Sequence, residues 1–127
     1  MLSLMYNVLI ADDDVDAWFQ VNALLRRHFL KASFVTNLSA AKQYIEQHIP
    51  SLLFFDRQLQ KHSTLDFIKY VRSKYPEAKI IMINPHGEGS PGFKQGVDLT
   101  ISKPLMPEML ERAIEKLLSP GQPAFAY

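Results

Sequence analysis

Three short, almost entirely apolar runs limit the folds open to this chain. They are Tyr6–Ala11, Ser51–Phe55 and Lys79–Ile83, and none of them alternates polar with apolar residues. Continuous runs of this kind are typical of parallel strands covered by helices on both faces, because a strand with one solvent face alternates. Weaker strand patterns lie at Ser33–Thr36 and Leu99–Ser102. The sequence therefore predicts five strands in a sheet that is buried on both sides.

Helical patterns separate these strands. Apolar residues recur at helical spacing in Asp16–Phe29, Ser39–His48, Thr64–Tyr75 and Met106–Leu118. Alternating strands and helices predict parallel strands joined by right-handed crossovers. We therefore expect an α/β fold of the flavodoxin-like class, a doubly wound five-stranded parallel sheet with helices on both faces. The segment Asn84–Gly96 holds four of the five Gly, so we expect the fourth helix, with Ser90 as its N-cap, to be short or irregular.

Length and composition indicate one cytoplasmic domain without disulfides. The chain has 127 residues, no Cys and four scattered His, and no apolar run approaches the roughly 18 residues of a membrane span. The start of the chain lacks the basic and small-residue features of a signal peptide. A formal net charge of +1 argues against direct nucleic-acid binding by charge alone. We expect one domain over residues 5–118 and a tail, or the start of a linker, over 119–127.

The charge is distributed unevenly along the chain. Residues 1–56 carry a net charge of −2 and residues 57–127 a net charge of +3. Four of the six acidic residues in the first part lie within Asp12–Asp16, directly after the first predicted strand. The neutral average therefore conceals a compact acidic cluster.

Polar residues follow the predicted strands at the edge where ligands bind. In an open parallel sheet that edge is formed by the carboxyl ends of the strands. The first predicted strand ends in Asp12 and its two acidic neighbours, the third in Asp56 and the fourth in Asn84, and the fifth runs into Lys103 and Pro104. If these strands are neighbours, their terminal side chains converge.

Converging carboxylates and one lysine indicate phosphoryl chemistry. The carboxylates repel one another unless a cation neutralises them, and oxygen ligands without thiols favour Mg²⁺ or Mn²⁺. A lysine ammonium is suited to a transferring phosphoryl group, and a carboxylate can act as its nucleophile. This pattern predicts phosphorylation of Asp56, with Lys103 beside it.

The residues alone leave other interpretations open. Asp12–Asp14 is also compatible with a solvated loop that begins a helix, and an Asp after a strand is a common turn residue. A flavodoxin-like cofactor binder needs a phosphate-cradling loop after the first strand, where these carboxylates would repel a phosphate.

Four sequence segments carry a resemblance to a known family. VLIADDD, LLFFD, KIIMIN and GVDLTISKPL resemble the first, third, fourth and fifth strands of a bacterial two-component response regulator receiver domain, of the chemotaxis-regulator type. The resemblance runs from Tyr6 to Leu118 and includes the spacing of Asp12, Asp56 and Lys103.

The resemblance implies a function for each of these residues. A histidine kinase or phosphotransfer protein would phosphorylate Asp56, Lys103 would pair with the phosphoryl group, and the peptide bond to Pro104 would be cis. Asp13, Asp56 and the backbone carbonyl of Gln58 would bind Mg²⁺ or Mn²⁺, with Asp12 acting through water. The domain would act on an unidentified output partner without being a turnover enzyme. Dimerisation stays open.

Several residues depart from the family pattern. Asn84 replaces the usual Thr or Ser, Pro85 the small residue after it, and Thr100 the aromatic residue of the fifth strand. Asn84 and Thr100 are therefore the expected switch residues of an atypical receiver whose mobile part is Asn84–Gly96. Gln58 and His86 are expected to tune the lifetime of the phosphorylated state.

The loop after Asp56 also departs from the pattern. Gln60 stands where the family usually has Pro, and Ser63-Thr64 where it has Asp-Gly. Asn84, Pro85 and Thr100 favour a rival interpretation, a degenerate receiver that binds partners without phosphorylation, whereas the intact set of acidic residues argues against it. A haloacid-dehalogenase-type phosphatase fits poorly, because its second Asp would have to stand where Gln58 is.

Overall fold

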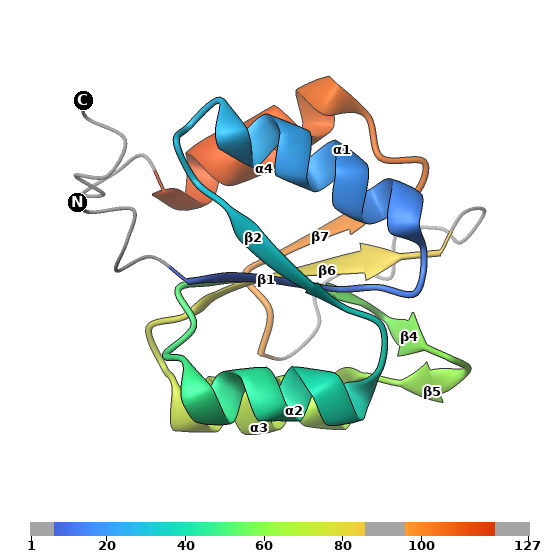
Figure 1. The fold of residues 1–127 in the computed structure, drawn as a ribbon, viewed down its shortest axis with the longest axis vertical. Helices are drawn as coiled ribbons and strands as arrows, with labels where there is room; N and C mark the ends of the chain where they lie inside the picture. Colours follow the sequence, from blue (N-terminus) through green and yellow to red (C-terminus); the bar gives the residue numbers. More distant parts are fainter. Residues whose placement is uncertain (1–6, 86–95, 119–127) are drawn as a thin grey trace.

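The computed structural model describes residues 7–85 and 96–118, which form a five-stranded parallel sheet, a two-stranded antiparallel sheet and four helices (Figure 1). The strand order of the large sheet is β2-β1-β3-β6-β7. In chain order the elements are β1 (Val8–Ala11), α1 (Val15–Arg26), β2 (Ala32–Val35), α2 (Leu38–Gln47), β3 (Leu52–Asp56), β4 (Gln58–Leu59), β5 (His62–Ser63), α3 (Leu65–Lys74), β6 (Lys79–Asn84), β7 (Leu99–Ser102) and α4 (Pro107–Leu118).

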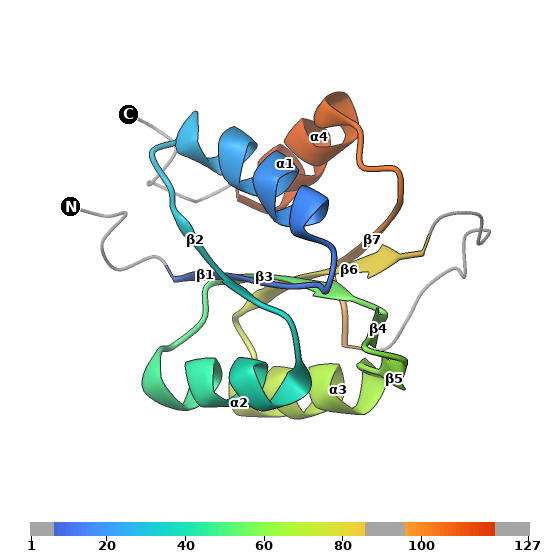
Figure 2. The same ribbon diagram turned by 45° about the vertical axis from the view of Figure 1, so that its right-hand side comes forward.

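Helices cover the large sheet on both faces, as predicted. Figure 2 shows α1 and α4 on one side of the sheet and α2 and α3 on the other. All four pairings of neighbouring strands are parallel. The direction of the strand order reverses between β1 and β3, which places the topological switch point beside the predicted acidic residues.

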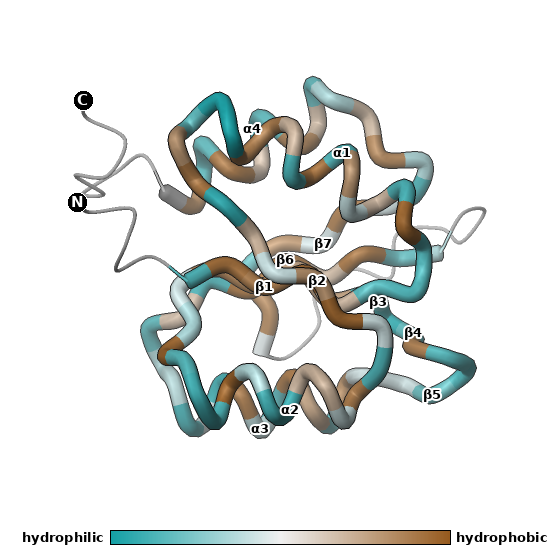
Figure 3. Tube along the Cα trace, in the orientation of Figure 1, coloured by the Kyte–Doolittle hydropathy of each residue, from teal (hydrophilic) through white to brown (hydrophobic). Residues whose placement is uncertain are grey.

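Alternating residues of each buried strand pack into two separate cores. In β1, Val8 and Ile10 face α1 and α4, whereas Leu9 and Ala11 face α2 and α3. β3 and β6 divide in the same way, and Figure 3 shows the apolar colour along these strands. This two-sided burial explains the continuous apolar runs in the sequence.

Two strands end in predicted site residues. β3 ends in Asp56 and β6 ends in Asn84, as predicted. Both residues therefore have backbones fixed by the sheet.

Helix α1 is shorter than predicted and ends at Arg26 instead of Phe29. Phe29 has a left-handed backbone with φ of 61°, which stops the helix. The Leu30 amide donates to the Leu25 carbonyl at 2.9 Å and the Phe29 amide to the Arg26 carbonyl at 3.0 Å. These two bonds form a Schellman motif, in which Phe29 occupies the position that usually holds Gly.

The hairpin of β4 and β5 was not predicted. Leu59 pairs with His62, which leaves Gln60 and Lys61 as a two-residue turn with φ values of 51° and 70°. Turns of this kind favour Asn-Gly, so the sequence carried no signal for it.

Two expected segments, the short helix beginning at Ser90 and the tail over 119–127, lie outside the described residues. Within 7–85 and 96–118, no helix has the length and hydrophobicity needed to cross a membrane.

Candidate functional site

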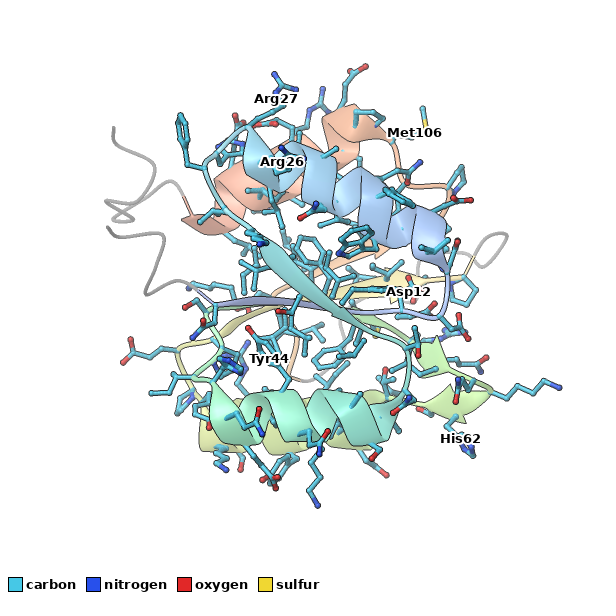
Figure 4. All side chains as sticks on the ribbon, viewed as in Figure 1. Asp12, Arg26, Arg27, Tyr44, His62 and Met106 are labelled. Atoms are coloured by element: carbon cyan, nitrogen blue, oxygen red, sulfur yellow. The ribbon has the colours of Figure 1, made fainter. Side chains whose placement is uncertain are left out.

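Four strands bring the predicted site residues to one edge of the sheet. Asp12 follows β1, Asp56 ends β3, Asn84 ends β6, and Lys103 follows β7. These four strands are neighbours in the sheet, so their carboxyl ends lie side by side. Figure 4 labels Asp12 at this edge, where the chain turns from β1 into α1. The predicted convergence is confirmed.

Lys103 joins the acidic residues of this edge. Its Nζ lies 3.1 Å from Asp12 Oδ1 and 3.1 Å from Asp56 Oδ2. The Lys103–Pro104 peptide bond is cis, as the resemblance implied. A single ammonium group thus bridges the carboxylates that follow β1 and end β3.

Asp14 also lies near Lys103, which the sequence analysis did not predict. Its Oδ2 is 3.7 Å from Lys103 Nζ. Its other oxygen accepts a hydrogen bond from the Asp16 amide at 3.0 Å and so caps α1. The sequence places Asp14 just before a predicted helix, but its distance to Lys103 depends on the fold.

Three carboxylates form a cluster with the spacing of a metal site. One oxygen each of Asp12, Asp13 and Asp56 lies within 4.8 Å of the others. Asp12 and Asp56 are buried, whereas Asp13 is exposed. The structure therefore brings together three of the four predicted metal ligands through their side chains.

Backbone amides orient each carboxylate of the cluster. The amide of Asp14 donates to Asp12 Oδ1 at 2.9 Å. In β4, the backbone amide of Gln58 donates to Asp56 Oδ1 at 3.0 Å. In the turn that follows, the backbone amide of Gln60 donates to Asp13 Oδ2 at 3.1 Å. The unpredicted hairpin thus holds two members of the cluster.

Thr64 anchors the chain behind Asp56. Its hydroxyl is fully buried and donates to the backbone carbonyls of Asp56 at 2.7 Å and Arg57 at 3.1 Å. In the sequence, Thr64 is only a departure from the family pattern and the start of a predicted helix. Its burial and its two carbonyl partners depend on the fold, so the sequence carries no signal for this role.

The electrostatics of the cluster are unfavourable without a cation. Burial raises the pKa of Asp12 to about 7, and repulsion from Asp56 adds to this effect against the opposing Lys103. Burial alone would lower the pKa of Lys103, but the Asp12 and Asp56 carboxylates outweigh it and the pKa is raised. Lys103 therefore stays protonated, and its single positive charge lies near three carboxylates, those of Asp12, Asp14 and Asp56.

This cluster fits a hard divalent cation. Asp12 Oδ2 is buried and has no hydrogen-bond partner among the described residues. An unpaired buried carboxylate oxygen carries a large desolvation cost, which a cation would relieve. The donors are all oxygens, as Mg²⁺ and Mn²⁺ prefer. Gln58, whose carbonyl was the fourth predicted ligand, lies in β4 two residues after Asp56.

Asn84 is a buried amide at the same edge. Its side chain is 0% exposed, and both Oδ1 and Nδ2 lack a hydrogen-bond partner among the residues that the structure describes. Its backbone carbonyl accepts from the Lys103 amide at 3.0 Å. Asn84 thus offers one free donor group and one free acceptor next to the strands that carry Asp56 and Lys103.

The other expected switch residue lies further from the edge. Thr100 is half-buried in β7 and is the register partner of Met82, whereas Asn84 pairs with Ser102. His86, the second expected rate-tuning residue, lies outside the described residues.

One protein family matches this chain over most of its length. The sequence model of the response regulator receiver domain covers residues 8–115.

Two curated relatives contain a similar region. Response regulator Rre1 of Synechocystis sp. is 24% identical in an alignment of 122 residues that covers 91% of this chain and 53% of Rre1. The hydrogenase transcriptional regulatory protein HoxA of Bradyrhizobium diazoefficiens is 24% identical in an alignment of 119 residues that covers 91% of this chain and 24% of HoxA. The chain therefore spans about half the length of one relative and a quarter of the other.

Solved structures share the fold. The receiver domain of NtrX from Brucella abortus superposes with a TM-score of 0.78 at 24% identity, covering 89% of this chain and 98% of that chain. A CheY-like receiver domain protein from Methanospirillum hungatei superposes with a TM-score of 0.75 at 24% identity, covering 89% of this chain and 94% of that chain. The beryllofluoride-activated NtrC4 receiver domain dimer superposes with a TM-score of 0.78 at 20% identity, covering 89% of this chain and 96% of that chain.

Proposed function

The chain belongs to the response regulator receiver domain family of two-component systems, and we propose that it accepts a phosphoryl group on Asp56 from a histidine kinase or phosphotransfer protein. The observation that carries this proposal is the contact of Lys103 Nζ with both Asp12 and Asp56 at 3.1 Å, inside a carboxylate cluster at the switch point of the sheet. This arrangement provides a nucleophile, a cation and metal ligands at one edge.

Asp56 is the nucleophile of the proposed transfer. An Asp56 carboxylate oxygen attacks the phosphorus, and the bond from phosphorus to the donor's leaving atom breaks, with its electron pair going to that atom. Gln58 N–H and Lys103 hold the two Asp56 oxygens before the reaction. Lys103 then balances the negative charge of the acyl phosphate, because its raised pKa keeps it protonated.

Asp13, Asp56 and the Gln58 carbonyl are the proposed ligands of Mg²⁺ or Mn²⁺, with Asp12 acting through water. A bound divalent cation would supply charge neutralisation for the phosphoryl oxygens and the carboxylates. The partnerless Asp12 Oδ2 and the raised Asp12 pKa support this assignment. The Gln60 amide keeps the exposed Asp13 carboxylate turned toward the cluster.

Asn84 is the proposed donor to the phosphoryl group in place of the usual hydroxyl. Its buried Nδ2 has no competing partner among the described residues, so it is available to a phosphoryl oxygen. A longer amide in place of a hydroxyl, together with Thr100 in place of an aromatic residue, gives a receiver that switches atypically. Gln58, whose side chain is exposed beside Asp56, is proposed to tune the lifetime of the acyl phosphate.

The proposed role is signalling without turnover of a separate substrate. The phosphorylated domain would act on a downstream output partner. The rival role, a degenerate receiver that binds partners without phosphorylation, makes the opposite prediction for Asp56.

Intact-mass spectrometry after incubation with acetyl phosphate and Mg²⁺ tests the proposal. We expect the mass to increase by one phosphoryl group, and this gain to disappear in EDTA and in Asp56→Asn. The matched control Asp66→Asn, an exposed carboxylate at the start of α3, should be phosphorylated like the wild type. Trp18, the single Trp of the chain, lies in the first turn of α1 after the acidic residues and serves as a fluorescent reporter. An unmodified wild-type protein, with no change in Trp18 fluorescence on adding beryllofluoride and Mg²⁺, would support the degenerate receiver instead.

A further inference from the structure

Phe29 combines two unfavourable features at the end of α1. Its backbone is left-handed, with φ of 61°, and its side chain is 80% exposed. A side chain with a Cβ pays about 1–2 kcal/mol to adopt this conformation, which Gly adopts freely. Because the ring is exposed, its burial does not offset this conformational cost. The fold therefore gives no reason for Phe at this position.

The backbone motif itself does not require the ring. The Schellman motif is made by the amides of Phe29 and Leu30, and the buried Leu30 provides its hydrophobic contact. A Gly at position 29 would make the same hydrogen bonds. Residues that lower stability without a structural return are candidates for function.

Two exposed basic residues lie close to Phe29 in the sequence and line the same hollow. Arg26 and Lys31 are exposed on either side of Phe29 and form no ion pair with the described residues. Favourable interaction with the helix dipole explains Arg26 but not Lys31, which lies beyond the helix. A surface hollow of about 470 Å³ runs between them, lined by Asn22, Arg26, Phe29, Leu30 and Lys31.

This surface lies at the far end of α1 from the acidic cluster. The helix has 12 residues, so about 18 Å of helix separates its two ends. Figure 4 labels Arg26 and Arg27 at one end and Asp12 near the other. The phosphoryl chemistry therefore does not account for the hollow.

We propose that the hollow around Phe29 binds a short acidic peptide segment of a partner protein, with an apolar residue of the peptide against the Phe29 ring and its carboxylates on Arg26 and Lys31. Charge complementarity favours an acidic ligand. The surface beyond Arg26 favours a short one, because a second hollow holds Glu108, Glu111 and Glu115, which outnumber its two cations, Arg27 and Arg112. These carboxylates would repel a long polyanion or an anionic membrane that extended beyond Arg26 and Lys31.

An array of random decapeptides, probed with the fluorescently labelled full chain, tests this proposal. We expect bound peptides to be enriched in Asp or Glu together with a large apolar residue. Phe29→Gly, which keeps the backbone motif, and Lys31→Glu should each weaken the selected peptides at least tenfold in a fluorescence-polarisation titration. The matched controls Ile49→Ser and Lys42→Glu, exposed elsewhere on the molecule, should bind like the wild type.

Three results would overturn the proposal. The first is an array without acidic-apolar enrichment, and the second is enrichment that Phe29→Gly and Lys31→Glu leave unchanged. The third is a different ligand on the same residues: vesicles containing phosphatidylserine, a single-stranded oligonucleotide, or a second copy of this chain seen by sedimentation, lost in the same two variants. Phosphorylation of Asp56 should be unaffected in Phe29→Gly, so failure here is distinct from failure of the proposed function.

Discussion

Replacing Asp12 by Asn should stabilise the metal-free protein although it removes a residue of the site. Asp12 is fully buried, and burial, followed by repulsion from Asp56, raises its pKa from 3.8 to about 7. Each pH unit of displacement corresponds to about 1.4 kcal/mol, so ionised Asp12 lowers the free energy of unfolding by an amount on the order of 4 kcal/mol at pH 8. The Asn Oδ1 still accepts from the Asp14 amide and from Lys103, but the contact with Lys103 loses its charge and the new Nδ2 stands where Oδ2 has no partner, which reduces the gain to about 2 kcal/mol.

The pH dependence identifies Asp12 as the cause. Between pH 4 and 7 the folded state binds more protons at Asp12 than the unfolded state does, so the contribution of this group to stability falls as the pH rises. The difference between Asp12→Asn and wild type should therefore be small near pH 4 and complete at pH 8. Urea unfolding in EDTA, followed by circular dichroism at four pH values, measures this difference.

Magnesium should reverse the order of stability. A cation that binds the folded wild type raises its free energy of unfolding in proportion to the logarithm of its concentration, whereas the variant has lost one carboxylate. Asp66→Asn, an exposed first-turn residue of α3, is the control for the substitution itself and should lose a few tenths of a kcal/mol at most. Two results would refute this explanation. One is an Asp12→Asn variant that is less stable than wild type at pH 8 in EDTA, and the other is a difference in the free energy of unfolding that is the same at pH 4 and at pH 8.

The remaining predictions concern the backbone and its anchors. Phe29→Gly should raise the free energy of unfolding by about 1 kcal/mol in urea, because it removes the left-handed penalty, and a loss of stability would contradict the Schellman assignment. Thr64→Val should lower the free energy of unfolding by about 1–2 kcal/mol and slow phosphorylation by acetyl phosphate, because the Asp56 carbonyl loses its hydroxyl donor. Unchanged stability would argue against that contact. Arg72→Lys should lower the free energy of unfolding by about 1–2 kcal/mol, because Arg72 donates to three backbone carbonyls and to Asp98. Amide hydrogen exchange near β7 should also accelerate, and equal exchange rates would argue against a stabilising role of these contacts.

The sheet could be predicted because its signal is local. Each buried strand is an apolar run, and alternate residues fill two cores, so the sequence pattern and the burial have the same cause. The carboxyl-edge rule then selected Asp12, Asp56 and Lys103 before any coordinates. Their distances confirm the convergence.

The helix and hairpin ends could not be predicted because they depend on unusual backbone conformations. Phe29, Gln60 and Lys61 all have positive φ values at positions where Gly or Asn would be the recognisable signal. The helical pattern of α1 therefore appeared to continue to Phe29. The hairpin was missed, and with it the amide of Gln60 on Asp13.

The sequence alone predicts the fold class, the carboxylate cluster and the proposed nucleophile Asp56, because each prediction depends on residue type and on spacing along the chain. Which groups share a charge depends on the packing of the strands. Lys103 lies near Asp14 as well as Asp12 and Asp56. One Asp12 oxygen and both side-chain polar atoms of the buried Asn84 have no hydrogen-bond partner among the described residues. Burial and distance between strands set these electrostatics, and neither quantity is encoded by any one segment of the chain.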